Sequence, residues 1–268
     1  MAELGNEELV LTMEGTVATI WLNRPAKRNA VTFTMWEMIP RLLEEVTANE
    51  EARVLVVRGA GDHFSGGADI AQLQTQLVDT TSSGGFREIN GVAEDALARF
   101  ALPTIAYITG FCVGSGCQIA VACDLRIADS SSRFGITPAK LGITYPSFAV
   151  ERTVALMGAS AAKHLLLSGE LIDAQRALRV GLIDEVLEPE LAVARLDELT
   201  ATLASRSLMT QRAGKEMVAD VVEFGAVREE TAKRWEHEAS TGPDVSEGVA
   251  AFLERRDPQF TWRKPAQS

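Results

Sequence analysis

Two glycine-rich turns with the same build constrain this chain more than any other feature. The first spans residues 64–70 (Phe-Ser-Gly-Gly-Ala-Asp-Ile) and the second residues 110–118 (Gly-Phe-Cys-Val-Gly-Ser-Gly-Cys-Gln). Each follows an apolar run typical of a buried strand, at 54–57 and at 104–108, and each opens into a helical pattern. Such turns direct unpaired backbone amides toward one point. We predict that the amides of Ala68 and Ser115 form an oxyanion hole, although two structural turns without a ligand would leave the same pattern.

The rest of the chain fits a repeated strand–turn–helix unit, which indicates an α/β fold with parallel strands. A hairpin is expected over 9–22 and further short strands at 125–128 and 183–187. Helical patterns cover 34–49, 69–78 and 86–100, and the glycine- and serine-rich segment 79–85 predicts a flexible loop. From about residue 188 onward only helical patterns occur, and their apolar residues require a partner surface.

The charge of the chain argues against several classes of partner. The 268 residues have a formal net charge of −11, so neither nucleic acid nor an anionic membrane surface is expected to bind. The uncharged segment 100–123 is long enough to cross a membrane, but Pro103, Gly110, Gly114 and Gly116 interrupt it. The N-terminus is acidic and has no apolar signal core. We expect a soluble cytoplasmic protein.

The cysteines and histidines indicate neither disulfides nor a metal site. Cys112, Cys117 and Cys123 all lie in one apolar segment, and the three histidines are far from them in sequence. This spacing matches no zinc motif and is typical of buried thiols in a reducing compartment. No metal and no permanently bound cofactor are therefore expected.

Several motifs together resemble the enoyl-CoA hydratase/isomerase (crotonase) superfamily. The match runs over nearly the whole chain, in order and in spacing. The segments that carry it are Asn-Arg-Pro-x-x-x-Asn-Ala at 23–30, the two glycine turns, Cys-Asp-Leu-Arg-Ile-Ala at 123–128, Phe-Gly at 134–135, Ser-Gly-Glu-Leu-Ile at 168–172 and Gly-Leu-Ile-Asp-Glu-Val at 181–186.

The resemblance implies a fold, a substrate class and an assembly. It implies a ββα spiral core over residues 1–190, which holds the acyl-CoA site, and a C-terminal helical trimerisation region over 191–268. It further implies an enzyme of fatty acid metabolism, a lyase or isomerase that takes acyl-CoA thioesters, with coenzyme A as part of the substrate. Trimers, or hexamers made of two trimers, are expected.

The resemblance also places the ligand. The implied site residues, besides Ala68 and Ser115, are Lys27, Asn29 and Ala30 at the coenzyme A entrance, Asp69 and Ile70 beside the thioester, and the turn glycines Gly67 and Gly114. Arg24, Lys27 and Arg28 form a basic cluster that suits ligand phosphates, although a solvated loop would account for it as well.

Two positions depart from the family pattern. Hydratases of this superfamily have glutamates where this chain has Gln118 and Pro138. Those carboxylates work as a general acid–base pair on water. An amide such as Gln118 can orient a water molecule but cannot take its proton at neutral pH, and Pro138 has no proton chemistry. Standard hydration by the usual pair is therefore not expected.

Tyr145 is the best replacement group in the sequence. It follows the segment 138–144, and methylmalonyl-CoA decarboxylases of the superfamily have a tyrosine at the equivalent place. A phenol can donate a proton or hold a departing carboxylate, but a tyrosine packed in the pocket wall is an equally good interpretation. A serine nucleophile at Ser115 is disfavoured, because the Gly-x-Ser-x-Gly spacing is incomplete.

These observations predict an acyl-CoA enzyme that stabilises a thioester enolate by a non-standard reaction. Ala68, Ser115, Gln118 and Tyr145 are the predicted catalytic residues. Two alternatives remain open at this point: a lyase similar to methylmalonyl-CoA decarboxylase that uses Tyr145, and a non-catalytic acyl-CoA-binding protein.

Overall fold

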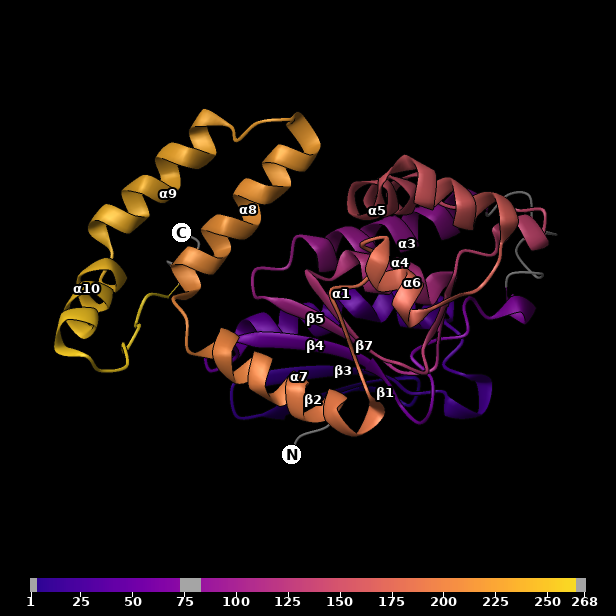
Figure 1. Cartoon of the computed structure of the whole chain (residues 1–268), viewed down its shortest axis with the longest axis horizontal. Helices are drawn as coiled ribbons and strands as arrows, with labels where there is room; N and C mark the ends of the chain where they lie inside the picture. Colours follow the sequence, from indigo (N-terminus) through magenta and orange to yellow (C-terminus); the bar gives the residue numbers. More distant parts are fainter. Residues whose placement is uncertain (1–3, 73–82, 264–268) are drawn as a thin grey trace.

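The computed structural model describes residues 4–72 and 83–263, and its main feature is a seven-stranded sheet (Figure 1). In spatial order this sheet contains β1 (Leu4–Asn6), β2 (Leu9–Glu14), β3 (Val17–Leu22), β4 (Val54–Gly59), β5 (Thr104–Ile108), β7 (Leu125–Asp129) and β10 (Glu185–Leu187). A second sheet contains β6 (Phe111–Val113), β8 (Arg133–Gly135) and β9 (Ile172–Asp173). The strands from β3 to β10 pair in parallel, as the repeated units predict.

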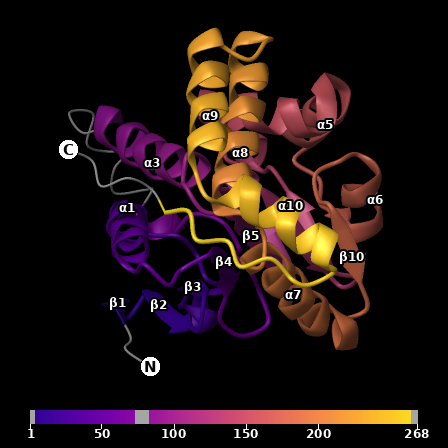
Figure 2. The same cartoon turned by 90° about the vertical axis from the view of Figure 1, so that its left-hand side faces the viewer.

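Helices cover both faces of the large sheet, and the last helices of the chain extend beyond it (Figure 1). They are α1 (Phe33–Ala48), α3 (Ser83–Ala98), α4 (Ser115–Ala122), α5 (Ser147–Ser168), α6 (Ala174–Arg179), α7 (Pro189–Ala204), α8 (Leu208–Phe224), α9 (Glu229–Thr241) and α10 (Asp244–Glu254). Figure 2 shows α1 and α7 on opposite sides of the strands. Parallel strands covered on both faces have continuous apolar runs, which explains why β4 begins with Val-Leu-Val-Val.

Two clusters of buried side chains divide the core at the sheet. Leu55 and Val57 of β4 belong to the larger cluster, together with the apolar face of α1. Val54 and Val56 point the other way and pack against Leu196 of α7. Alternation along a strand sends successive side chains to opposite faces, so one apolar strand supplies both clusters. The core thereby fixes β4, whose carboxyl end at Gly59 leads to the first glycine turn at 64–70.

Most predicted elements are confirmed, with one correction. The loop predicted over 79–85 ends earlier, because α3 begins at Ser83, while residues 79–82 lie outside the described residues. Ala93 and Leu97 of α3 are buried, and α3 packs along α1. Tertiary packing of this kind supplies most of the stability of a helix, so α3 can include Gly84 and Gly85 although both have low helix propensity. Of the helix predicted over 69–78, the described part is helical at 70–72.

The last helices extend away from the sheet (Figure 1). The start of this region docks on the core through Lys215 of α8, whose Nζ lies 2.7 Å from Asp124 Oδ2. Farther along, several apolar side chains of α8 and α10 face outward, with Phe252 82% and Leu253 75% exposed. The first helix after residue 190, α7, covers the sheet instead. The proposed boundary between 1–190 and 191–268 stays a prediction, as does the trimerisation role.

The three cysteines are free and buried, as expected. Within 4–72 and 83–263, no group of three or more His, Cys, Asp or Glu side chains could hold a metal ion. In the same part of the chain, no helix combines the length and the hydropathy that a membrane span requires.

Candidate active site

The two glycine turns lie side by side and are hydrogen-bonded to each other. Ser65 N donates to Phe111 O over 2.7 Å, and Val113 N donates to Ser65 O over 3.0 Å. At the far end of this contact, a Cβ atom added to Gly114 would lie 3.7 Å from the Cα of Gly67. The residues that follow the two glycines, which supply the predicted oxyanion-hole amides, are therefore brought together.

Neither of those amides is used by the fold in the part of the chain that is described. Ala68 pairs with Val31 as an isolated parallel bridge. The two hydrogen bonds of this bridge join Val31 to the residues on either side of Ala68: Val31 N donates to Gly67 O (2.8 Å), and Asp69 N donates to Val31 O (2.9 Å). The Ala68 N–H consequently points away from Val31. Ser115 is the first residue of α4, where an amide has no partner within the helix. Two free donors at adjacent turns, one at a helix N-terminus, can hold an oxyanion.

The conformation of the turns explains their glycines. Gly67 has φ 113° and Gly114 has φ 51°, both in the left-handed region that favours glycine. Gly116 is required for a different reason, since a Cβ there would approach the Cβ of Ser65 to 2.8 Å. The glycine spacing in the sequence thus has two causes: backbone conformations with positive φ, and the close approach of the two turns.

The predicted coenzyme A residues divide into groups that the fold uses and groups that it leaves exposed. Arg24 is mostly buried and pairs with Asp69 (Nη1 to Oδ2, 2.9 Å) and with Glu8 (Nε to Oε1, 3.1 Å). Its hydrogen bond lowers the pKa of Asp69 below the usual value. Asn29 is fully buried, and its Nδ2 donates to the carbonyl oxygens of Ala60 (2.9 Å) and His63 (2.6 Å). These side chains join the loop 23–30 to the first turn.

Other members of that set remain available to a ligand. Lys27 is exposed, and Ile70 is 53% exposed directly after the first turn. The carbonyl of Ala30 accepts a hydrogen bond from Arg24 Nη1 (2.7 Å), which fixes this end of the loop. The basic character of the loop toward solvent therefore comes from Lys27 and the neighbouring Arg28, not from Arg24.

The predicted acid–base residues cluster beside the second turn. The Tyr145 hydroxyl donates to Gly114 O over 3.2 Å, one residue from the Ser115 amide. Gln118 is buried one turn along α4, and its Oε1 has no hydrogen-bond partner among the described residues. Burial raises the pKa of Tyr145 well above its usual value, so the phenol stays protonated. Pro138 opens a short 3₁₀ turn, Pro138–Lys140.

One residue near this cluster was not predicted from the sequence. Glu94 of α3 is fully buried, and both of its carboxylate oxygens lack a hydrogen bond within the described residues. Burial raises the pKa of Glu94 to about 8, although Arg152 opposes the shift. The available signal was positional: Glu94 follows Ala93 and precedes Leu97 on a helix whose apolar face is buried, where a charged residue is costly.

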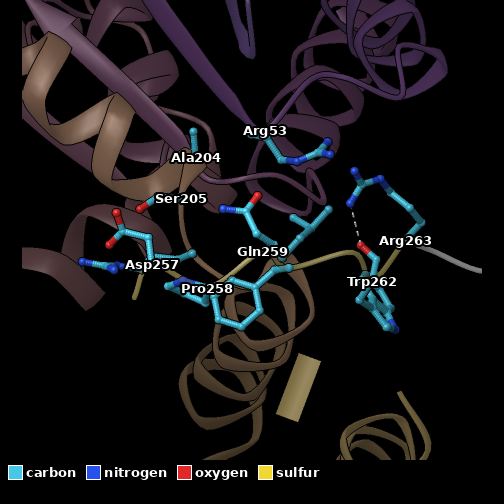
Figure 3. Close-up of a pocket in the computed structure, with 11 residues that line it drawn as sticks. Arg53, Ala204, Ser205, Asp257, Pro258, Gln259, Trp262 and Arg263 are labelled. Carbon is cyan, nitrogen blue, oxygen red and sulfur yellow. Dashed lines mark hydrogen bonds between the residues drawn. The ribbon is translucent and has the colours of Figure 1, made fainter. Parts of the chain in front are cut away.

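A separate cavity of about 280 Å³ lies between the core and the C-terminal segment (Figure 3). Its wall includes Arg53, Arg206 and Arg263 together with Asp257, and none of the predicted site residues lines it. Arg53 precedes β4, whereas the first glycine turn follows the other end of this strand. The cavity is therefore at the opposite edge of the sheet from the glycine turns.

The comparisons with known proteins point to one family. The family model for enoyl-CoA hydratase/isomerase matches residues 12–263. The short-chain-enoyl-CoA hydratase of Clostridium acetobutylicum is 30% identical, over 95% of this chain and 97% of its own length. The 2,3-dehydroadipyl-CoA hydratase of Escherichia coli is also 30% identical, over 96% and 99%.

A solved structure extends the agreement to the fold. The enoyl-CoA hydratase/carnithine racemase from Magnetospirillum magneticum superposes with a TM-score of 0.92 at 28% identity, over 97% of each chain. The mixed α/β architecture is thus the crotonase fold that the sequence motifs predict. Because the family model covers nearly all of the sequence and relatives of this identity align over almost their full length, this chain belongs to the enoyl-CoA hydratase/isomerase family.

Proposed function

We propose that this protein is an enzyme that stabilises the enolate of a coenzyme A thioester and acts as a lyase or isomerase. The observation that carries the proposal is the pair of amides at Ala68 and Ser115, from which no described residue accepts a hydrogen bond, on turns whose glycines lie close together. A thioester oxygen gains negative charge when the α-carbon loses a proton or the β-carbon is attacked. Two fixed donors bind that anion more tightly than the neutral carbonyl, so they lower the barrier.

The groups at the second turn suit proton donation better than base catalysis on water. Gln118 can orient a water molecule or a substrate group, and Tyr145 stays protonated, so neither takes a proton at neutral pH. We therefore propose that the reaction differs from hydration by a pair of glutamates at positions 118 and 138.

Decarboxylation of a malonyl-type thioester is the second candidate. It is favoured by the hydrogen bond from Tyr145 to Gly114 O, which holds the phenol next to the second turn. Loss of carbon dioxide leaves the enolate directly, so this reaction needs the oxyanion hole and a proton donor but no base. The absence of carboxylates at positions 118 and 138 fits such a reaction.

The loop 23–30 is proposed to hold the coenzyme A moiety. Lys27 is exposed at its tip and can approach the phosphates as a flexible point charge. Arg24, Asn29 and Ala30 contribute by fixing the loop against the first turn. Ile70, exposed beside that turn, can contact the acyl or pantetheine part of the ligand.

We further propose a trimer built through the C-terminal helices. Val218, Val222 and Phe224 of α8 are more than half exposed, and so are Phe252 and Leu253 of α10. So many exposed apolar residues on the C-terminal helices α8 and α10 are typical of an interface. Light scattering on the purified protein would report the number of subunits.

A substrate panel tests the proposed reaction class. Purified protein is mixed with enoyl-, 3-hydroxyacyl- and malonyl-type coenzyme A thioesters, and the products are followed by mass spectrometry. Turnover of a malonyl-type substrate alone would select decarboxylation. Binding of these thioesters in calorimetry without turnover of any would establish the non-catalytic acyl-CoA-binding protein instead.

A further inference from the structure

Unpartnered polar groups gather where α3, α4 and α5 pack together. The polar cluster is defined here as Asn90 and Glu94 of α3, Gln118 of α4, Tyr145, and Arg152 of α5. The described residues provide no hydrogen bond for Asn90 Oδ1 and Nδ2, both oxygens of Glu94, Gln118 Oε1 or Arg152 Nη1. A buried polar group without a partner costs about 1–3 kcal/mol, and native proteins contain few of them. Several in one place indicate that a polar ligand or a reacting group completes them.

Two members of the cluster, Glu94 and Arg152, lie close together. Arg152 Nη1 lies 3.6 Å from Glu94 Oε2, which is close enough for electrostatic attraction and too long for a good hydrogen bond. Asn90 is one helical turn before Glu94 and is equally buried. Burial raises the pKa of Tyr145, and the negative charges of Cys117 and Glu94 act in the same direction.

One member of the cluster, Tyr145, contacts the second glycine turn. The Tyr145 hydroxyl donates to Gly114 O, and Gln118 lies on α4, the helix that Ser115 begins. Glu94 lies on α3, which packs against α4, so its buried carboxyl is on a helix that contacts the second turn's helix. Among the described residues of the cluster, Glu94 is the only carboxylic acid.

We propose that Glu94 is the catalytic residue that exchanges a proton with the α-carbon of the bound thioester, replacing the carboxylates absent at positions 118 and 138. This inference rests on the proposed function. In the forward step the α-carbon C–H bond breaks, its proton goes to a Glu94 oxygen, and the electron pair moves into the enolate, whose oxygen the two amides hold. In the return step the Glu94 O–H bond breaks, the α-carbon regains a proton, and the carbonyl forms again.

The surroundings suit a group that must exist in both protonation states. Burial favours the neutral acid, and Arg152 stabilises the carboxylate that forms when the proton leaves. Asp95, the next residue on α3, bonds the other side of Arg152 at 3.1 Å. On the α4 side the titratable groups are the buried thiols of Cys112 and Cys117 and the Tyr145 phenol. The charged residues of α1 (Glu37, Arg41, Glu44 and Glu45) are exposed to solvent.

Deuterium exchange isolates this proton transfer from the rest of the reaction. The full-length protein is incubated with butyryl-CoA in D₂O, and incorporation at the α-carbon is followed by mass spectrometry. Glu94→Gln should slow exchange by about 100-fold or more, the usual range for a lost general acid–base group. Glu151→Gln, an exposed glutamate on α5, is the matched control and should leave the rate unchanged.

The pH profile separates a proton-transfer role from a structural one. Exchange by the unsubstituted protein should rise with pH as Glu94 ionises and level off above about 8. Glu94→Asp should keep this rise at a lower rate, and Glu94→Gln should lose it. Circular dichroism establishes that each variant is folded, and Glu94→Asp keeps the test decisive if the glutamine variant does not fold.

The failures of the two proposals are distinguishable. If the unsubstituted protein exchanges the proton and Glu94→Gln does so equally fast, the role of Glu94 is overturned while the enolate mechanism stands. If calorimetry shows that butyryl-CoA binds but no exchange occurs in any protein, the role of Glu94 is overturned, and the substrate panel then decides whether the enolate mechanism stands. If butyryl-CoA does not bind, the proposed function itself fails.

Discussion

The glycine turns and the polar cluster are neighbours but were built under different constraints. At the turns the useful groups are backbone amides, whose positions depend on the left-handed φ of Gly67 and Gly114. In the polar cluster the useful groups are side chains, and the carboxylates expected on α4 and at Pro138 are absent while a buried carboxyl is present on α3. An oxyanion hole made of backbone amides therefore requires a specific local sequence, whereas an acid–base side chain can come from another element of the fold.

The largest expected effect comes from removing one amide. Ser115→Pro deletes the N–H at the first position of α4, where proline is well tolerated in a helix. It should lower kcat/KM by about 10²–10³-fold, the usual loss of one oxyanion donor. Steady-state kinetics on the best substrate of the panel measures it. Ser115→Ala is the control: it keeps the amide and should retain activity, whereas a large loss in Ser115→Ala would support a serine nucleophile.

The next largest effect should be a gain of hydratase activity. Gln118→Glu together with Pro138→Glu places carboxylates at the two positions that hydratases of the family use. We expect the hydration of crotonyl-CoA to rise by roughly 10–100-fold, because each base–acid group contributes substantially to adding water. The assay follows loss of the enoyl absorbance. A folded double variant with unchanged hydration would contradict the positional assignment of residues 118 and 138.

The pH dependence of the free energy of unfolding tests the raised pKa of Glu94 without an activity assay. The folded-state pKa of Glu94, about 8, is above its unfolded value, so its stabilising contribution is complete below about pH 4.5 and is lost as the pH rises toward 8. Glu94→Gln should therefore gain stability relative to the unsubstituted protein across this window, by on the order of a few kcal/mol at pH 8.5. Thermal unfolding at pH 5 and pH 8.5 measures it. Equal Tm differences at both pH values would refute the raised pKa.

The smallest effect concerns the loop 23–30. Lys27→Ala should weaken coenzyme A binding by about threefold, the scale of one exposed ionic contact, and the difference should shrink at high salt. Calorimetry with coenzyme A gives the affinity, and Lys163→Ala, an exposed lysine on α5, is the control. If Lys27→Ala binds with unchanged affinity at low salt, the phosphates are held elsewhere.

The sequence predicts the parts of this molecule that local rules determine. The apolar run of β4, the hairpin over 9–22 and the glycine turns are all visible because their patterns follow strand alternation, turn chemistry or close backbone approach. The helical start at Ser83 was not predicted, because packing on α1 outweighs the low helix propensity of Gly84 and Gly85. The start of this helix depends on a tertiary contact, which the local sequence does not indicate.

The site shows the same division. The proximity of the two turns followed from their strands, which are neighbours in a parallel sheet. The sequence of the basic loop did not show that Arg24 and Asn29 fix the loop to the first turn, because this role depends on their partners Asp69 and His63. Glu94 was missed for a related reason: its chemistry arises from burial against α4 and α5, and an isolated glutamate in a helix is ordinary in sequence.

A crystal structure with a bound thioester enolate analogue would test the central claim most directly. In a complex with acetoacetyl-CoA, we expect the thioester oxygen to lie about 2.7–3.1 Å from the backbone nitrogens of both Ala68 and Ser115. A thioester oxygen that contacts neither nitrogen, with the acyl group held away from the two glycine turns, would contradict the account.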